Sequence, residues 1–109
     1  MASQPRKVTA RDILGDFAPK FTELTDHVLF DDVWERPGLG KRDRSLITVA
    51  ALVALNRTQQ LEFHLKLALE NGLTKDELIE AITHLAFYSG WPVSMSAMAM
   101  AREIFEKRK

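Results

Sequence analysis

The chain of 109 residues contains no cysteine. This absence excludes disulfides, thiolate metal sites and cysteine nucleophiles. Net charge is also absent, since 15 basic residues balance 15 acidic ones, and this balance argues against nucleic acid or an anionic membrane as the main partner. The first residues carry no apolar run of the kind found in a secretory signal, so a cytoplasmic location is expected. Chemistry in this chain must therefore depend on histidine, carboxylate, guanidinium or aromatic groups.

Long apolar runs are also missing. The longest is at residues 46–55, where every residue except Thr48 is apolar, and this is far short of the roughly 20 residues needed to span a bilayer. No membrane partner is expected. The run instead predicts a helix that is buried on all sides, with Arg42 and Arg44 before it and His64 shortly after it.

No alternating strand pattern occurs, and apolar residues recur at helical spacing along the chain. We therefore expect an all-α fold, with residues 1–8 as a flexible arm and residues 9–109 as a single domain. Thr9, Thr58 and Thr74 are candidate helix caps, and Thr74 forms a capping box with Glu77. The six helical segments expected are residues 9–16, 19–30, 41–55, 59–71, 75–89 and 93–107.

The last predicted helix is rich in alanine, serine and methionine, which permit close helix packing and fill irregular gaps. Together with the apolar run at 46–55, this composition predicts more apolar surface than one small chain can cover. Self-association into a symmetric homo-oligomer is therefore expected.

His64 is the first candidate for chemistry. Its spacing places it with Leu61, Leu65 and Ala68 on the apolar face of its helix, away from Glu62. A histidine in such a position is either a satisfied core group or a functional imidazole, and spacing alone leaves both open.

A second candidate lies on the next helix. Glu80 and His84 are four residues apart and therefore neighbours, and Tyr88 extends the line toward Trp91. A carboxylate beside an imidazole orients it and raises its pKa, as a general acid or base near neutral pH requires. The alternative is a surface pair without function.

Four further residues are candidates for binding an anionic substrate. Arg42 and Arg44 lie at the start of the predicted helix 41–55, near free backbone N–H groups, which favour anions, although a solvated pair is the alternative. Trp34 and Arg36 adjoin a Pro-Gly turn and are suited to wall a carboxylate pocket, although packing alone also explains the tryptophan. The three histidines are scattered without metal-ligand spacing, so no metal and no cofactor are expected.

Several blocks of residues carry a family resemblance when taken together and in order. The chain resembles the carboxymuconolactone decarboxylase family from about Asp12 to Phe105. The resemblance implies a compact six-helix bundle of the alkylhydroperoxidase-like type, with orthogonal and antiparallel helices. It also implies assembly into a homohexamer built as a trimer of dimers, or into a homotrimer. The blocks are Val33-Trp-Glu-Arg-Pro-Gly-Leu, Arg42-Asp-Arg-Ser-Leu-Ile-Thr, Leu61-x-x-His64, Ala68-Leu-x-x-Gly72-Leu-Thr, Glu77-x-x-Glu80-x-x-x-His84 and Tyr88-x-Gly90-x-Pro92.

The redox branch of this family uses Cys-x-x-Cys-x-x-x-His with a glutamate one helix earlier. When its histidine is placed on His64, the two cysteine positions fall on Arg57 and Gln60, and the glutamate position falls near Ser45. The thiols and the carboxylate are absent, so thiol peroxidase activity is not expected.

The resemblance is closer to the decarboxylase branch. It implies decarboxylation of 4-carboxymuconolactone to the enol-lactone of 3-oxoadipate in aromatic catabolism, without a cofactor. His64 would then donate the proton or a hydrogen bond to the oxyanion, and the Glu80–His84 pair is the second candidate for these roles. The substrate would be bound by residues from the loop and helix ends: Trp34, Arg36, Arg42, Arg44, Tyr88 and Trp91. Two alternatives remain open: an enzyme acting on another small organic acid, and a non-catalytic oligomeric helical module.

Overall fold

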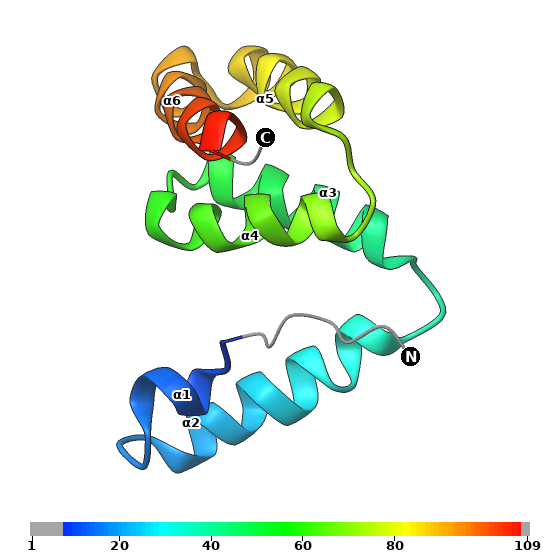
Figure 1. Cartoon of the computed structure of the whole chain (residues 1–109), viewed down its shortest axis with the longest axis vertical. Helices are drawn as coiled ribbons and strands as arrows, with labels where there is room; N and C mark the ends of the chain where they lie inside the picture. Colours follow the sequence, from blue (N-terminus) through cyan, green and yellow to red (C-terminus); the bar gives the residue numbers. More distant parts are fainter. Residues whose placement is uncertain (1–7, 108–109) are drawn as a thin grey trace. The chain divides into compact units, whose positions relative to one another are not determined.

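The computed structural model describes residues 8–107, and these residues are all helical or irregular, so the predicted all-α class is confirmed (Figure 1). The chain divides into two compact units, Met1–Gly38 and Leu39–Lys109. The boundary falls in the turn-rich stretch at residues 37–40, where the sequence predicts only a turn within one domain. Of the predicted N-terminal arm, residues 1–7 lie outside the described range, and Val8 is exposed.

The N-terminal unit begins with α1 (Ala10–Leu14), which Thr9 caps as predicted, and continues into α2 (Pro19–Glu23). The carboxylate of Asp26 accepts hydrogen bonds from the backbone N–H groups of Ala10 and Arg11, at 2.8 and 3.0 Å. These bonds attach the start of α1 to the segment that follows α2. A carboxylate at a helix N-terminus is favourable because it satisfies backbone donors that the helix leaves open.

The single α-helix predicted over residues 19–30 is wrong in its second half. After α2 the backbone continues as a π-helix, η1 (Leu24–Phe30), and a short 3-10 helix, η2 (Val33–Glu35), follows. The apolar pattern did not reveal this change, because Leu24 and Val28 are four residues apart, a spacing that places two side chains on one face of either kind of helix.

The described residues of the second unit, 39–107, form four helices: α3 (Lys41–Ala54), α4 (Thr58–Glu70), α5 (Lys75–Ser89) and α6 (Trp91–Lys107). Helix α3 packs along α4, α5 packs along α6, and α6 also contacts both α3 and α4. Their buried faces form one core. Its members are Val49, Val53, Leu61, Leu65, Ala68, Leu73, Leu78, Ile82, Ala97, Ala101, Ile104 and Phe105.

The boundaries of these helices follow the capping chemistry. The predicted capping box is present, since Thr74 and Glu77 exchange hydrogen bonds of 2.9 and 3.0 Å. Gly72 lies just beyond α4 with a positive φ of 106°, a conformation that favours glycine. Two predictions are wrong in detail: Arg57 holds the cap position of α4, with Thr58 already helical, and α6 begins at Trp91 rather than Val93. Pro92 fits in the first turn of α6, where a helix does not need its N–H.

Helix α3 corrects the prediction that residues 46–55 are buried on all sides. Val49 and Val53 are fully buried, but Ile47 is 58% exposed and Leu55 is 64% exposed. The helices that pack on α3 cover only the face that carries the two valines. An apolar stripe on the opposite face therefore remains on the surface of the chain.

We expect Thr74→Ala to lower the free energy of unfolding by about 1 kcal/mol, because the cap of α5 loses its side-chain acceptor. Chemical denaturation measures this difference. The matched control is Thr83→Ala on the same helix, whose hydroxyl bonds only to the carbonyl of Ile79 one turn earlier. Equal losses in the two variants would contradict a capping role for Thr74.

Candidate functional site

The first turn of α3 holds two of the predicted anion-binding arginines in different environments. The guanidinium of Arg42 pairs with Glu77, and it also pairs with Asp43 at 3.0 Å. The backbone N–H of Thr74 and the Arg42 guanidinium together lower the pKa of Glu77. Glu77 therefore closes the capping box of α5 and at the same time joins the start of α5 to the start of α3.

Arg44 lies two residues further along α3 and is half-buried. Its Nε donates a hydrogen bond of 2.9 Å to the backbone carbonyl of Leu39. This bond fixes the base of the guanidinium against the segment that leads into the helix. Of the two arginines in this turn, Arg44 is the less exposed.

Ser45 is fully buried beside this turn, and its hydroxyl accepts a hydrogen bond of 2.9 Å from Nδ2 of Asn71 at the end of α4. A neutral serine therefore stands inside the core at the position where the resemblance places a glutamate in the redox branch. The bond ties the beginning of α3 to the end of α4.

His64 lies in the middle of α4 and is half-buried at the edge of the core. Leu61, Leu65 and Ala68 on the same face are fully buried, which confirms the predicted orientation. The ring of Phe63 meets the imidazole edge to face, with 5.0 Å between centroids. Burial lowers the pKa of His64, so the imidazole is neutral at pH 7. A neutral imidazole acts as a hydrogen-bond donor or a base more readily than as a strong proton donor.

The second candidate line lies on α5 and at the start of α6, and it faces outward. Glu80 and His84 are both exposed, and within residues 8–107 no ion pair or hydrogen bond joins them. His84 instead stacks on Tyr88, with 4.8 Å between ring centroids. Trp91 is 60% exposed and meets Phe87 edge to face. The expected carboxylate–imidazole pair is therefore replaced by an aromatic surface.

Trp34 and Arg36 lie in the N-terminal unit, in and just after η2. The ring of Trp34 is buried and stacks on Phe30 with 6.0 Å between centroids. Packing thus accounts for the tryptophan. Arg36 is exposed, and its backbone N–H donates to the carbonyl of Val33.

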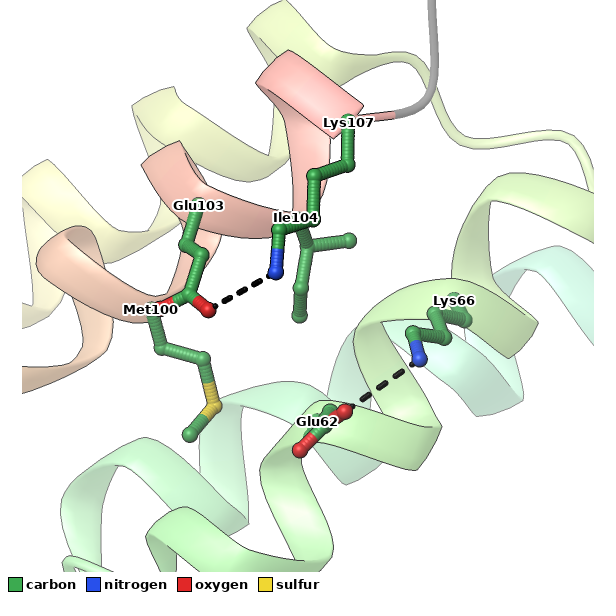
Figure 2. A pocket seen from close by; sticks show the side chains of 6 residues that line it. All are labelled: Glu62, Lys66, Met100, Glu103, Ile104 and Lys107. Carbon is green, nitrogen blue, oxygen red and sulfur yellow. Dashed lines mark hydrogen bonds and ion pairs between the residues drawn. The ribbon is translucent and has the colours of Figure 1, made fainter.

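One cavity of about 350 Å³ lies between α4 and α6, and none of the predicted site residues lines it (Figure 2). Its walls are two ion pairs, Glu62 with Lys66 and Glu103 with Lys107. Met100 and Ile104 supply its apolar part. The cavity is therefore distinct from the candidate residues on α3 and α5, and from α4 it is lined by Glu62 and Lys66 rather than by His64.

The fold brings some of the predicted residues together and separates others. Arg42 and Arg44 share one helical turn, and Glu80, His84 and Tyr88 share one exposed line. His64 lies on α4, and both α4 and α5 pack against α3 and α6. Two contacts were not predicted from the sequence: the ion pair of Arg42 with Glu77 and the hydrogen bond between Asn71 and Ser45. Only the capping box hinted at the first, and no local signal marked the second.

The described part of the chain offers neither a metal site nor a membrane span. Among residues 8–107, no three histidine, aspartate or glutamate side chains gather as a group able to hold a metal ion. In the same range, none of the helices combines the length and the apolar composition that crossing a bilayer requires.

Comparison with known proteins gives a consistent set of relatives. Residues 19–103 match the carboxymuconolactone decarboxylase family. The chain is 45% identical over 93 residues to a 4-carboxymuconolactone decarboxylase from Acinetobacter baylyi. The matched residues make up 85% of this chain and 69% of the relative.

Two other relatives are more distant. A nitrosuccinic acid decarboxylase from Metarhizium robertsii is 35% identical over 81 residues, with 74% of this chain and 57% of the relative covered. An uncharacterized 15.0 kDa protein from Paracoccus denitrificans is 28% identical over 78 residues, with 70% and 58% covered. The chain thus spans less than two thirds of the length of these two proteins.

We expect the imidazole of His64 to titrate below the ordinary histidine value of about 6.5, because burial disfavours its charged form. The pKa in the unfolded chain is the higher of the two, so below about pH 6.5 the unfolded state binds more protons. The free energy of unfolding should therefore fall as the pH drops from there toward the lowered pKa. NMR titration of the imidazole measures the first effect and urea denaturation across this range the second.

The variant His64→Gln provides the control, since a glutamine does not titrate in this range. Its stability should depend less on pH between about 6.5 and 5 than that of the unchanged chain. An imidazole that titrates at or above the ordinary value would contradict a desolvated His64.

Proposed function

Because this chain belongs to the carboxymuconolactone decarboxylase family, we propose that it is a carboxy-lyase that removes CO2 from 4-carboxymuconolactone or a closely related small acid. In this proposal the reaction needs no metal and no organic cofactor. The single observation that carries it is the 45% identity with a 4-carboxymuconolactone decarboxylase along most of this chain. A half-buried neutral imidazole on α4 is compatible with the chemistry.

The substrates named for two relatives share a chemical pattern that defines the substrate class. Nitrosuccinic acid and 4-carboxymuconolactone both contain a carboxylate on a carbon whose neighbour is a CH2–carboxylate. In both, that first carbon also bears an electron acceptor, a nitro group in one and an unsaturated lactone in the other. We therefore take the class to be succinates substituted by an electron-accepting group, with 4-carboxymuconolactone as the first candidate.

Decarboxylation of such a compound needs little from a protein. The bond between the ring carbon and the carboxylate breaks, CO2 leaves, and the electron pair moves through the double bond onto the lactone carbonyl oxygen. One proton then adds to carbon and gives the enol-lactone. A site that excludes water, donates a hydrogen bond to the developing oxyanion and supplies that proton lowers the barrier.

In this proposal His64 donates the hydrogen bond to the oxyanion. The lowered pKa of His64 supports this role over that of proton donor, because a neutral imidazole N–H is a weak acid but an effective hydrogen-bond donor. Its place at the edge of the core supports it as well, since hydrogen bonds to a developing charge are stronger where water is excluded. The Glu80–His84 line on α5 is then the candidate source of the proton.

The retained CH2–carboxylate is the group that a guanidinium should bind. A guanidinium that held the departing carboxylate would stabilise the ground state and slow the reaction. We assign the retained carboxylate to Arg44, which is half-buried with its Nε fixed to Leu39. Arg42 is paired with Glu77 and Asp43, so its proposed contribution is to hold the start of α3. Arg36 and Trp34 lie in the N-terminal unit, and this assignment gives them no role.

We also propose that a second copy of the chain covers the exposed aromatic surface of α5 and α6. Phe87, Tyr88, Trp91 and Met95 are all more than half exposed, and the rings of Phe87 and Trp91 meet edge to face. Contiguous large apolar groups of this kind are typical of protein interfaces. A homo-oligomer, a trimer or a hexamer in this proposal, would also enclose Glu80 and His84 and place them in a pocket between copies.

The main competing function is decarboxylation of a different acid of the same class, which the likeness to a nitrosuccinic acid decarboxylase supports. The two substrates differ in the acceptor that takes the electron pair, which is the lactone carbonyl in one and the nitro group in the other. Both compounds should therefore be assayed with the same preparation.

We expect the purified protein to convert 4-carboxymuconolactone without added metal or nucleotide, and His64→Ala to lower kcat by about a hundredfold or more. His64→Gln, which keeps an N–H donor, should retain more activity than the alanine variant. Loss of the lactone absorbance measures the rate. His27→Ala is the matched control, because His27 is an exposed histidine paired with Asp31 in the N-terminal unit.

No turnover of 4-carboxymuconolactone or nitrosuccinate by a folded, assembled preparation would reject the enzyme proposal and favour a non-catalytic helical module. Turnover of nitrosuccinate alone would favour the competing substrate. If His64→Ala changes only stability, the oxyanion role of His64 is wrong while the function stands.

We expect the double variant Tyr88→Glu with Trp91→Glu to reduce the molar mass in solution toward the 12.4 kDa of one chain. Two charges placed in an apolar interface lose their hydration there, so association should weaken. Light scattering after size exclusion measures the mass. The control, Gln59→Glu with Gln60→Glu, adds the same charge at exposed positions of α4. An unchanged mass in the first variant would contradict the proposed interface.

A further inference from the structure

The cavity between α4 and α6 is lined by both positive and negative side chains, a mixture that the proposed decarboxylase site does not need. Its volume of about 350 Å³ falls at the lower end of the range of about 300–1,000 Å³ found for small-molecule sites. Its wall contains two ammonium and two carboxylate groups, which cancel in charge. The dianionic substrate proposed above would face two glutamates here, so the cavity does not suit it.

The arrangement of these groups defines the ligand that would fit. In Figure 2 the ion pair of α6, between Lys107 and Glu103, and the ion pair of α4, between Lys66 and Glu62, lie on either side of the cavity. The N–O distances are 3.1 Å on α6 and 3.2 Å on α4. Met100 and Ile104 extend from α6 toward α4 and line the cavity.

A ligand with one positive and one negative group can exchange partners with these ion pairs without leaving a charge unmatched. The exchange costs little, because exposed ion pairs between residues four apart on a helix contribute only weakly to stability. An apolar side chain on the ligand would then lie against Ile104 and Met100, whose flexible thioether adapts to different shapes. A ligand with one charge would gain less, since half of the polar wall would keep its original partners.

We propose that this cavity binds a small zwitterionic amino acid with an apolar side chain. The ammonium group of the ligand lies toward Glu62 and Glu103, and its carboxylate lies toward Lys66 and Lys107. This site is separate from the proposed decarboxylase site, so either can fail without the other.

Leucine is the probe, and amide NMR of the full chain is the measurement. We expect saturable shifts at the lining residues of α4 and α6. Three analogues test the charge pattern: 4-methylpentanoate has only the carboxylate, 3-methylbutylamine only the ammonium, and succinate two carboxylates. Each should bind at least about tenfold more weakly than leucine, the loss expected when one matched charge is removed.

Variants test the location of the site. Lys66→Met and Glu103→Met remove one group of each sign from opposite walls, and each should weaken leucine binding by about tenfold. Arg102→Met is the matched control, because it breaks the pair with Glu106 on α6 without touching the cavity. Circular dichroism establishes whether each variant is folded. Because the two substitutions are on different helices, the test still stands if one of the variants does not fold.

Three outcomes would overturn the proposal. One is the absence of saturable shifts with leucine up to its solubility limit. The second is binding of succinate or of either single-charge analogue as tightly as leucine. The third is undiminished leucine binding in folded Lys66→Met and Glu103→Met.

Discussion

Four helices share one core in the second unit, and each helix can turn only one face toward it. This constraint decides where the candidate functional groups of this unit lie. Val49 and Val53 of α3, Leu61 and Leu65 of α4, and Leu78 and Ile82 of α5 occupy the interior. Whatever lies on the opposite faces, including the apolar residues Ile47 and Leu55, is left on the surface of the chain. Groups at the margins of the buried faces, such as His64, are only half-buried.

One ion pair and one hydrogen bond at the start of α3 connect this helix to the ends of its neighbours. Glu77 uses one carboxylate oxygen to cap α5 and the other to bind Arg42. Asn71 reaches from the end of α4 to the buried hydroxyl of Ser45. Together these bonds attach both ends of the α4–α5 connection to the first turns of α3, where Arg44 lies. In the proposed function they position the arginine that binds the retained carboxylate, although neither of them touches the substrate.

The histidines on α4 and α5 differ because their surroundings differ. His64 adjoins fully buried leucines and the ring of Phe63, and the resulting desolvation keeps its imidazole neutral at pH 7. His84 is exposed and stacks on Tyr88. The proposed chemistry uses this difference, because a neutral N–H donor and a solvent-exposed group that a second copy would enclose can take separate parts in one reaction.

Local sequence patterns correctly predicted the helical class, the capping box at Thr74 and Glu77, the glycine that follows α4 and the inward face of His64. Each of these depends on contacts within a few residues, so spacing and residue type were sufficient. The π-helix at Leu24–Phe30 was missed because the four-residue spacing of Leu24 and Val28 fits an α-helix equally well. The early start of α6 was missed because a proline that often ends a helix is equally acceptable in its first turn.

Local patterns could not predict contacts between residues that are far apart in the sequence. The sequence by itself determined which residues form helices, which of them can cap or turn, and that thiol chemistry is absent. Only the tertiary structure decided that α3 is half exposed, that Arg42 is engaged by Glu77, that Glu80 and His84 face outward, and that paired charges on α4 and α6 enclose a cavity. The physical reason is that propensity and capping act within one helix, whereas burial and pairing depend on which faces a small core can accommodate.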